Sequence, residues 1–201
     1  IDIYLCKSTA SSLSNMAGLY IHIPFCKQAC HYCNFHFSTS LKYKGEVFAA
    51  ILKELEMRRD YLADSSVGTI YLGGGTPSLL SADEIKQIYD TIQKYYKAES
   101  VVEFTLEANP DDLARDYIRP LRHTPVNRFS IGVQSFRDED LVYMNRAHNA
   151  SQADYAIKAV QLEKTASGWK VTRAASVPTP EESIKDGVVV DTTAVAVTLR
   201  S

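Results

Sequence analysis

The chain has 201 residues, of which 45% are hydrophobic and 23% charged, with a formal net charge of −2 and a pI near 6.2. This length suits one well-buried domain and is short for two. The charge balance excludes a general electrostatic attraction to nucleic acid, and no apolar run approaches the about 20 residues that a membrane-spanning helix needs, so neither a nucleic-acid partner nor a membrane span is expected.

From Gly18 to about Leu162, strand-like runs alternate with helix-like stretches. Enrichment in β-branched and aromatic residues predicts four strands, at Leu19–Ile23, Thr69–Leu72, Val101–Leu106 and Arg128–Val133. Helices are predicted over Glu46–Leu62, after the capping box Ser81-Ala-Asp-Glu84, and from Ser151 onward. Apolar residues lie at helical spacing in the first two stretches, at Val47, Ile51, Leu55 and Leu62 and at Ile85, Ile88 and Ile92, and the third stretch carries Tyr155, Ile157 and Val160. Strands that alternate with helices predict an α/β fold of parallel βα units, either open or closed into a barrel.

The first predicted strand leads into Cys26-Lys-Gln-Ala-Cys30-His-Tyr-Cys33, a CxxxCxxC pattern. Three thiolates on one short loop can hold three corners of a cubane [4Fe–4S] cluster, which leaves the fourth iron open to a small molecule. A structural zinc site is the alternative, with His22, His31 or His36 as the fourth ligand. Zinc motifs usually come as two separated ligand pairs, and this sequence has no second pair.

Disulfide bonds are not expected among these cysteines. Residues 1–15 lack the basic start and continuous apolar stretch of a secretory signal, and three clustered cysteines leave one unpaired. The sequence therefore predicts a reduced, cytoplasmic setting.

Polar or glycine-rich segments also follow the other predicted strands. Gly73-Gly-Gly-Thr-Pro77 follows the second strand, Glu107-Ala-Asn-Pro110 ends the third, and Gln134 ends the fourth. Taken singly, these segments are explained equally well as a tight turn, a solvent-exposed acid and a turn residue. Because ligands bind at the carboxyl ends of parallel strands, their successive placement favours one site on one rim of the sheet. A glycine triplet also lets backbone groups approach a ligand closely, since no Cβ intervenes.

Several of these motifs together resemble the radical S-adenosylmethionine (SAM) family. The resemblance runs from about Met16 to Gln161 and rests on Tyr20-Ile-His-Ile-Pro-Phe-Cys26, on Gly73-Gly-Gly-Thr-Pro, on Leu106-Glu-Ala-Asn-Pro and on Ile131-Gly-Val-Gln-Ser-Phe136. Within the family, the motifs are similar to the oxygen-independent coproporphyrinogen III oxidases and to the haem chaperones of the HemW type. The oxidase pattern has a further cysteine where this chain has Phe35, which is similar to the haem-chaperone pattern. An oxidase that decarboxylates porphyrinogen propionates, and an inactive fragment of either branch, remain the alternatives.

The resemblance implies a [4Fe–4S] cluster and SAM as cofactors, with an electron donor protein and haem or a porphyrin as partners. The implied cluster ligands are Cys26, Cys30 and Cys33. The implied SAM pocket comprises Tyr20, Tyr32, Gly74, Gly75, Thr76, Glu107, Gln134 and Arg146. In it, the glycines and Thr76 receive the methionine end, Glu107 holds the ribose or neighbouring polar atoms, and Arg146 pairs with a carboxylate. An electron from the cluster then cleaves the sulfonium of SAM, but whether this chain turns SAM over as an enzyme stays open, and no further catalytic residue is assigned.

The resemblance also implies a partial radical-SAM (β/α) barrel, with about four of the six βα units of the family. Residues 1–15 lie outside the family pattern, residues 16–162 form a truncated core, and residues 163–201 match none of the missing units. The run Gly187–Leu199 is strand-like and could cover the edge left by the fourth strand. We expect instead that the tail is loosely held and does not rebuild the missing SAM-contacting strand.

Overall fold

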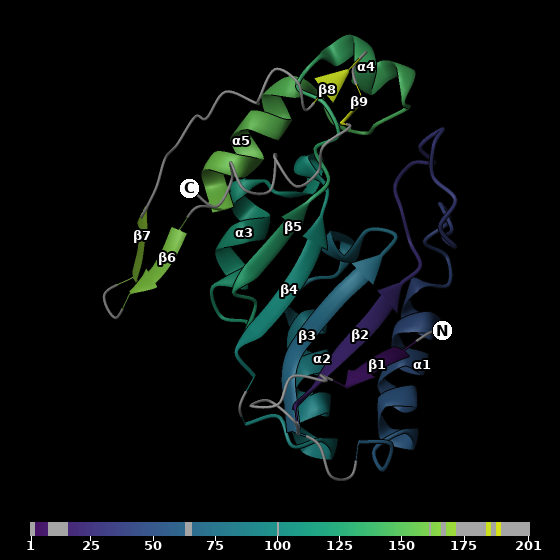
Figure 1. The fold of residues 1–201 in the computed structure, drawn as a ribbon, viewed down its shortest axis with the longest axis vertical. Helices are drawn as coiled ribbons and strands as arrows, with labels where there is room; N and C mark the ends of the chain where they lie inside the picture. Colours follow the sequence, from purple (N-terminus) through teal and green to yellow (C-terminus); the bar gives the residue numbers. More distant parts are fainter. Residues whose placement is uncertain are drawn as a thin grey trace.

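A five-stranded sheet forms the centre of the computed structural model, which describes residues 3–7, 16–62, 66–99, 101–160, 162–165, 168–171, 184–185 and 188–189 (Figure 1). The strands follow each other across the sheet in chain order: β1 (Ile3–Lys7), β2 (Met16–Ile23), β3 (Ser66–Gly74), β4 (Glu103–Ala108) and β5 (Arg128–Ile131). Strands β2 to β5 pair in parallel, which confirms the four predicted parallel strands. Strand β1 was not predicted, and it pairs with β2 in the antiparallel sense.

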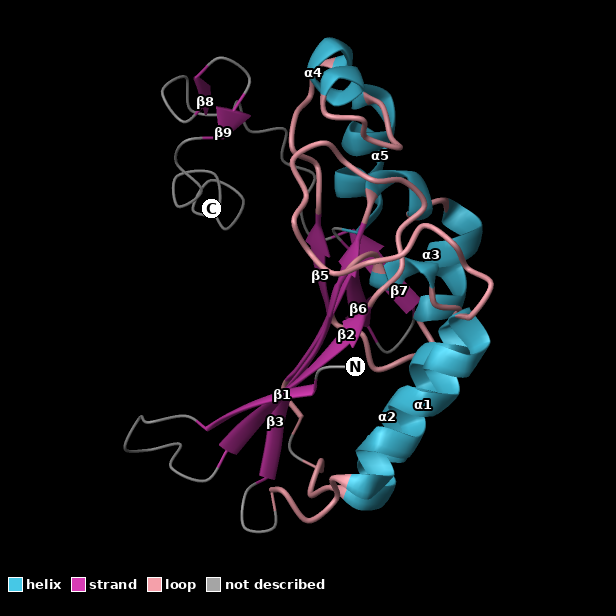
Figure 2. Cartoon of the chain, turned by 90° about the vertical axis from the view of Figure 1, so that its right-hand side faces the viewer, coloured by secondary structure: helices cyan, strands magenta, loops and turns pink. Residues whose placement is uncertain are grey.

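Helices alternate with the parallel strands, which confirms the predicted α/β fold. They are α1 (Lys44–Met57), α2 (Ala82–Tyr95), α3 (Arg115–Leu121), α4 (Asp138–Tyr143) and α5 (Ala150–Val160), with 3₁₀ turns η1 (Pro77–Leu79) and η2 (Pro110–Asp112). Helices α1, α2 and α3 lie along one face of the sheet (Figure 2).

The predicted capping box opens α2. The Ser81 hydroxyl accepts a hydrogen bond from the Glu84 main-chain N–H at 3.2 Å, and the Glu84 carboxylate accepts one from the Ser81 N–H at 2.7 Å. Helix α1 ends at Met57, so the predicted end at Leu62 is wrong, although Leu62 still reaches the core from the turn that follows.

The core lies between the sheet and helices α1 and α2, and it fixes the positions of the carboxyl ends of β2 to β5. Alternate residues of β2 are buried, and the residues between them, such as Tyr20 and His22, are only half-buried. The largest fully buried side chains are Leu19, Ile21, Ile23, Ile51, Leu55, Ile70, Leu72, Leu80, Ile85, Ile88, Ile92 and Phe104.

Helices α3 and α4 were not predicted, and both are short. Helix α3 has seven residues and contains Pro120, which removes one backbone donor and obscures the helical pattern. Helix α5 buries Ala153 and Ala156, whereas the larger Tyr155 is 47% exposed. Small residues therefore bring α5 close to its neighbours.

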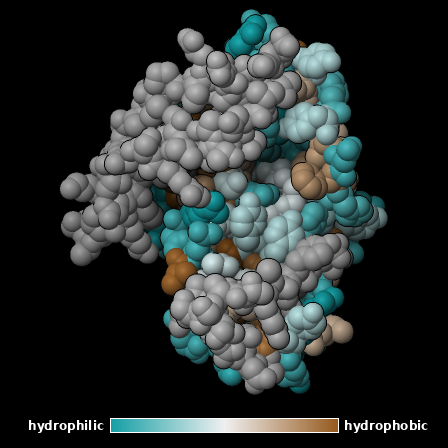
Figure 3. All heavy atoms as spheres, viewed as in Figure 1, coloured by the Kyte–Doolittle hydropathy of each residue, from teal (hydrophilic) through white to brown (hydrophobic). Residues whose placement is uncertain are grey.

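The described part of the tail forms two strand pairs that do not join the central sheet. Strand β6 (Leu162–Thr165) pairs with β7 (Gly168–Val171), and β8 (Ile184–Lys185) pairs with β9 (Val188–Val189). Most of the strand-like run Gly187–Leu199 lies outside the described residues. On the face shown in Figure 3, most of the visible described residues are hydrophilic or intermediate, and hydrophobic ones show in small patches. In the part of the chain that the structure describes, no helix is long and apolar enough to cross a membrane.

Candidate functional site

The cysteine loop begins where β2 ends and is closed at its base by main-chain hydrogen bonds. The Cys26 N–H donates to the Ser38 carbonyl at 3.0 Å, and the Ser38 N–H donates to the Pro24 carbonyl at 2.9 Å. Beyond Cys26, the Lys27 ammonium pairs with Asp111 at 2.8 Å and with Asp112, both from η2. The loop is thus anchored to the turn that follows β4 as well as to its own base.

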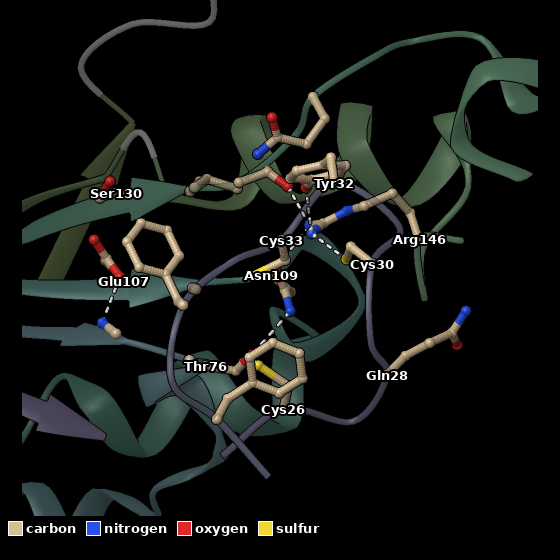
Figure 4. Close-up of a pocket in the computed structure, with 18 residues that line it drawn as sticks. Cys26, Gln28, Cys30, Tyr32, Cys33, Thr76, Glu107, Asn109, Ser130 and Arg146 are labelled. Atoms are coloured by element: carbon tan, nitrogen blue, oxygen red, sulfur yellow. Dashed lines mark hydrogen bonds between the residues drawn. The ribbon is translucent and has the colours of Figure 1, made fainter. Parts of the chain in front are cut away.

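The three cysteine side chains face one cavity of about 330 Å³ at the carboxyl ends of β3, β4 and β5 (Figure 4). This volume is in the range of about 300–1,000 Å³ typical of small-molecule sites. The structure therefore brings together the predicted site segments on one rim of the sheet. Ten of the eleven predicted site residues line the cavity: Cys26, Cys30, Tyr32, Cys33, Gly74, Gly75, Thr76, Glu107, Gln134 and Arg146.

Arg146 joins the cysteine loop to the ends of two strands. Its Nη1 donates to the Cys30 Sγ at 3.3 Å and to the Tyr32 hydroxyl at 3.1 Å. Its Nη2 donates to Asn109 Oδ1 at 2.8 Å and to the Gly132 carbonyl at 2.6 Å (Figure 4). Its Nε is buried and has no hydrogen-bond partner among the described residues. None of these acceptors is a carboxylate, so among the residues that the structure describes the guanidinium has no carboxylate counter-ion.

Glu107 lies inside β4 near its end, and both of its carboxylate oxygens are engaged. The Tyr71 hydroxyl donates to Oε1 at 2.6 Å, and the Gly74 N–H donates to Oε2 at 3.0 Å. Burial and this carboxylate raise the pKa of Tyr71, so the phenol stays protonated and donates. Glu107 is therefore held in one orientation toward the cavity.

Tyr20 is the one predicted site residue that does not line the cavity. Its ring stacks on Tyr71 at a centroid distance of 5.9 Å, and its hydroxyl lies 3.1 Å from His22 Nδ1. Tyr20 therefore packs against Tyr71, whose hydroxyl orients Glu107.

The fold itself requires glycine at two positions of the triplet, in addition to the predicted approach of a ligand. A Cβ on Gly75 would come within 2.6 Å of the Phe25 carbonyl oxygen, so only glycine lets β3 end against the start of the cysteine loop. Gly74 has a φ of 109°, which side chains rarely adopt, and a Cβ there would meet the His22 ring at 2.5 Å. Replacing Gly74 with valine would therefore distort the backbone as well as any ligand contact.

Two titratable groups that line the cavity, Cys26 and Tyr32, have a raised pKa. Burial raises the pKa of the Cys26 thiol, while a hydrogen bond with Thr76 acts in the opposite direction. Burial also raises the pKa of Tyr32, while the Arg146 guanidinium opposes this change.

Two of the three histidines considered as a fourth zinc ligand have main-chain partners. His22 Nε2 lies 3.0 Å from the His36 carbonyl oxygen, and His31 Nδ1 lies 2.8 Å from the Tyr143 carbonyl oxygen. Among the described residues, no three His, Cys, Asp or Glu side chains are spaced to hold a single metal ion.

Eight further residues line the cavity and were not predicted as site residues: Gln28, Phe35, Phe37, Ala108, Asn109, Ser130, Ile131 and Gly132. Asn109 could have been predicted as a site residue from the sequence, because it directly follows Glu107-Ala108 at the end of a strand. Its amide donates to the Thr76 hydroxyl at 3.2 Å, so it links the Gly-Gly-Gly-Thr segment to Arg146. Phe35 is 71% exposed at the cavity, and its place two residues after Cys33 in the cysteine loop was a signal for that position.

An α/β sheet with three clustered cysteines and a glycine-rich strand end around one cavity defines a protein of the radical SAM type. The profile of the Radical SAM superfamily matches residues 20–172, and the chain belongs to this family. This confirms the resemblance seen in the sequence.

Similar proteins narrow the relationship within the family. The chain is 38% identical over 135 residues to the haem chaperone HemW of Bacillus subtilis (strain 168), covering 66% of this chain and 36% of that protein. It is 39% identical over 146 residues to HemW of Escherichia coli (strain K12), covering 70% of this chain and 38% of that protein. The fold matches coproporphyrinogen III oxidase (HemN) from Escherichia coli, described as a radical SAM enzyme, with a TM-score of 0.65 and 25% identity over 73% of this chain and 34% of that one. The chain thus spans little more than a third of the length of these relatives, which agrees with a partial radical-SAM barrel.

Proposed function

We propose that this chain is a radical SAM protein of the haem-chaperone type, which binds a [4Fe–4S] cluster and SAM in the cavity described above and serves haem trafficking. The observation that carries the proposal is the placement around one cavity of three thiols and of the Arg146 guanidinium, which pairs with no carboxylate among the described residues. Such a donor set fits an iron–sulfur cluster together with a ligand that carries a carboxylate.

Each part of the cavity has a role in this proposal. Cys26, Cys30 and Cys33 hold the cluster, which supplies the electron that cleaves SAM when both are bound. Arg146 pairs with the carboxylate of SAM, and Glu107 accepts hydrogen bonds from its ribose or neighbouring polar atoms.

The remaining predicted residues complete the pocket. Backbone groups of Gly74, Gly75 and Thr76 receive the methionine end of SAM, while Gln134 and Tyr32 lie beside it. Tyr20 acts from outside the cavity, through Tyr71 and Glu107.

The haem-chaperone assignment rests on the names of the similar proteins and on Phe35. Relatives called HemW are 31% to 39% identical to this chain, whereas the oxidase structure is 25% identical. Phe35 stands where the oxidase pattern has a cysteine. Haem and an electron donor protein are the partners that this function needs, in a reducing, cytoplasmic setting. The oxidase fold match keeps coproporphyrinogen III oxidation as the second candidate.

Anaerobic iron–sulfur reconstitution tests the cofactor part of the proposal. The protein is expected to hold about four irons per chain and, after reduction, to convert SAM to 5′-deoxyadenosine. Cys30→Ala should lose the iron, whereas Cys6→Ala, which changes a cysteine outside the motif, should keep it. Stoichiometric zinc instead of iron, or equal iron in both variants, would contradict the cluster assignment.

The two candidate functions separate in a second experiment. A haem chaperone is expected to bind haem, seen as a shifted Soret band, and to leave coproporphyrinogen III unchanged. Decarboxylation of coproporphyrinogen III by the reconstituted protein would favour the oxidase.

A further inference from the structure

Residues 143–146, which begin at the last residue of α4, contact the middle of the cysteine loop. We call this segment the clamp. Its main chain contacts His31 twice: the His31 N–H donates to the Met144 carbonyl at 3.1 Å, and His31 Nδ1 lies 2.8 Å from the Tyr143 carbonyl oxygen. The clamp therefore holds the residue that follows Cys30.

Asn145 holds the residues that precede Cys30. Its Nδ2 donates to the Ala29 carbonyl at 2.7 Å, and its Oδ1 accepts from Gln28 Nε2 at 2.7 Å. The same Gln28 amide nitrogen reaches the Asn145 carbonyl oxygen at 3.0 Å. These contacts join positions 116 and 117 residues apart in the chain.

The backbone of Asn145 is specialised for this arrangement. Its φ is 56°, in the left-handed region that asparagine tolerates better than most side chains. In this conformation Asn145 reaches Gln28 and Ala29 while the next residue, Arg146, reaches the Cys30 Sγ at 3.3 Å. One short segment thus contacts the loop on both sides of Cys30 and at its thiol.

We propose that Asn145 is a positioning residue that fixes the Cys30 corner of the cluster loop. The inference rests on the proposed function, because it assigns Cys30 to a cluster. Cys26 has a separate support, because its N–H donates to the Ser38 carbonyl at 3.0 Å. The Cys33 N–H donates to the Cys30 carbonyl at 3.1 Å, so the position of Cys33 depends on that of Cys30. Without the Asn145 side-chain amide, the Ala29 carbonyl loses its partner in the clamp and the Gln28 amide keeps only the Asn145 main-chain carbonyl, so Cys30 gains freedom to leave its position.

The test compares Asn145→Gly with wild type. Glycine adopts a positive φ readily, so this variant keeps the backbone and removes only the amide. Loss of its two hydrogen bonds is expected to speed iron release to a chelator about tenfold or more. The midpoint reduction potential of the cluster and its paramagnetic resonance spectrum should change as well, because the hydrogen bonds and geometry around a cluster sulfur set them. A purely structural role elsewhere would not move these two readouts.

Further variants sharpen the comparison. Gln28→Ala removes one of the two side-chain hydrogen bonds of Asn145 and leaves the bond to Ala29, so it should speed iron release less than Asn145→Gly does. It should add little to Asn145→Gly in the double variant, because the side-chain contact between the two residues is already lost there. The matched control is Gln152→Ala, which removes a side-chain amide whose Oε1 accepts a hydrogen bond from the Asn149 N–H, outside the loop, and it should behave as wild type.

Amide hydrogen exchange of the iron-free protein provides a readout that needs no cluster. Residues 28–31 are expected to exchange about tenfold faster in Asn145→Gly than in wild type, while α2 is unchanged. If wild type holds its cluster and Asn145→Gly matches it in iron release, potential and exchange, the inference is overturned and the proposed function stands. A wild-type protein that takes up no iron overturns both.

Discussion

Replacing Gly75 with alanine is expected to displace the cysteine loop from the end of β3. A Cβ at this position would lie 2.6 Å from the Phe25 carbonyl oxygen and 2.9 Å from both the Phe25 nitrogen and the Ile23 carbonyl oxygen. All three are backbone atoms, so no side chain can rotate away. The Gly75 N–H also donates to the Ile23 carbonyl at 2.9 Å, which ties the two segments together where the methyl group would go.

The size of the effect follows from this overlap. The shortest contact falls well short of the 3.4 Å at which ordinary van der Waals contact begins. Overpacking of this kind costs about 1–3 kcal/mol. A loss of about 2 kcal/mol lowers the Tm of a chain of this size by about 4–8 °C. Because the strain falls on the residue before Cys26, iron uptake should fall together with the Tm.

Thermal unfolding followed by circular dichroism measures the first effect, and the iron content after anaerobic reconstitution measures the second. Gly45→Ala is the matched control, since a methyl group at Gly45 in α1 meets nothing within 4 Å and should cost neither stability nor iron. If Gly75→Ala retains the wild-type Tm and iron content, the close approach of β3 to the cysteine loop does not exist in solution.

Three further changes have expected outcomes. Arg146→Gln keeps a donor but removes the charge, so it should weaken SAM binding about tenfold or more in a calorimetric titration, and equal affinity would argue against the carboxylate contact. Burial lowers the pKa of His148 below its ordinary 6.5, with the Arg146 charge acting in the same direction. The stability that the neutral histidine contributes is present above about pH 6.5 and is lost as the pH falls through the lowered pKa of the folded state. The Tm of His148→Gln should therefore fall less than the Tm of wild type between about pH 7 and about pH 5. Parallel curves of Tm against pH would contradict this. Ser81→Ala should remove the α2 capping box, cost about 1 kcal/mol and lower the Tm by about 2–4 °C, without changing the iron content; a lowered iron content would show that α2 affects the loop.

The sequence alone determined the features whose partners are close together in the chain. The capping box of α2 was predictable because Ser81 and Glu84 are three residues apart, and the isoleucines behind it repeat at helical spacing. The parallel strands were predictable because β-branched runs alternate with helices, and parallel strands place their carboxyl ends on one rim. The cysteine loop, the glycine triplet and Glu107 could therefore be assigned to one site before the fold was known.

The tertiary structure decided which remote side chains meet at that site. Tyr20 stays outside the cavity because it lies three residues before the end of β2, and each strand residue adds about 3.3 Å. Asn109 became part of the site through its bond to Arg146, and Asn145 through its bond to Ala29, 116 residues away. Local patterns encode which residues form a strand or a cap. They do not encode contacts between segments that only the folded sheet brings together, and for that reason the clamp on the cysteine loop is visible in the structure alone.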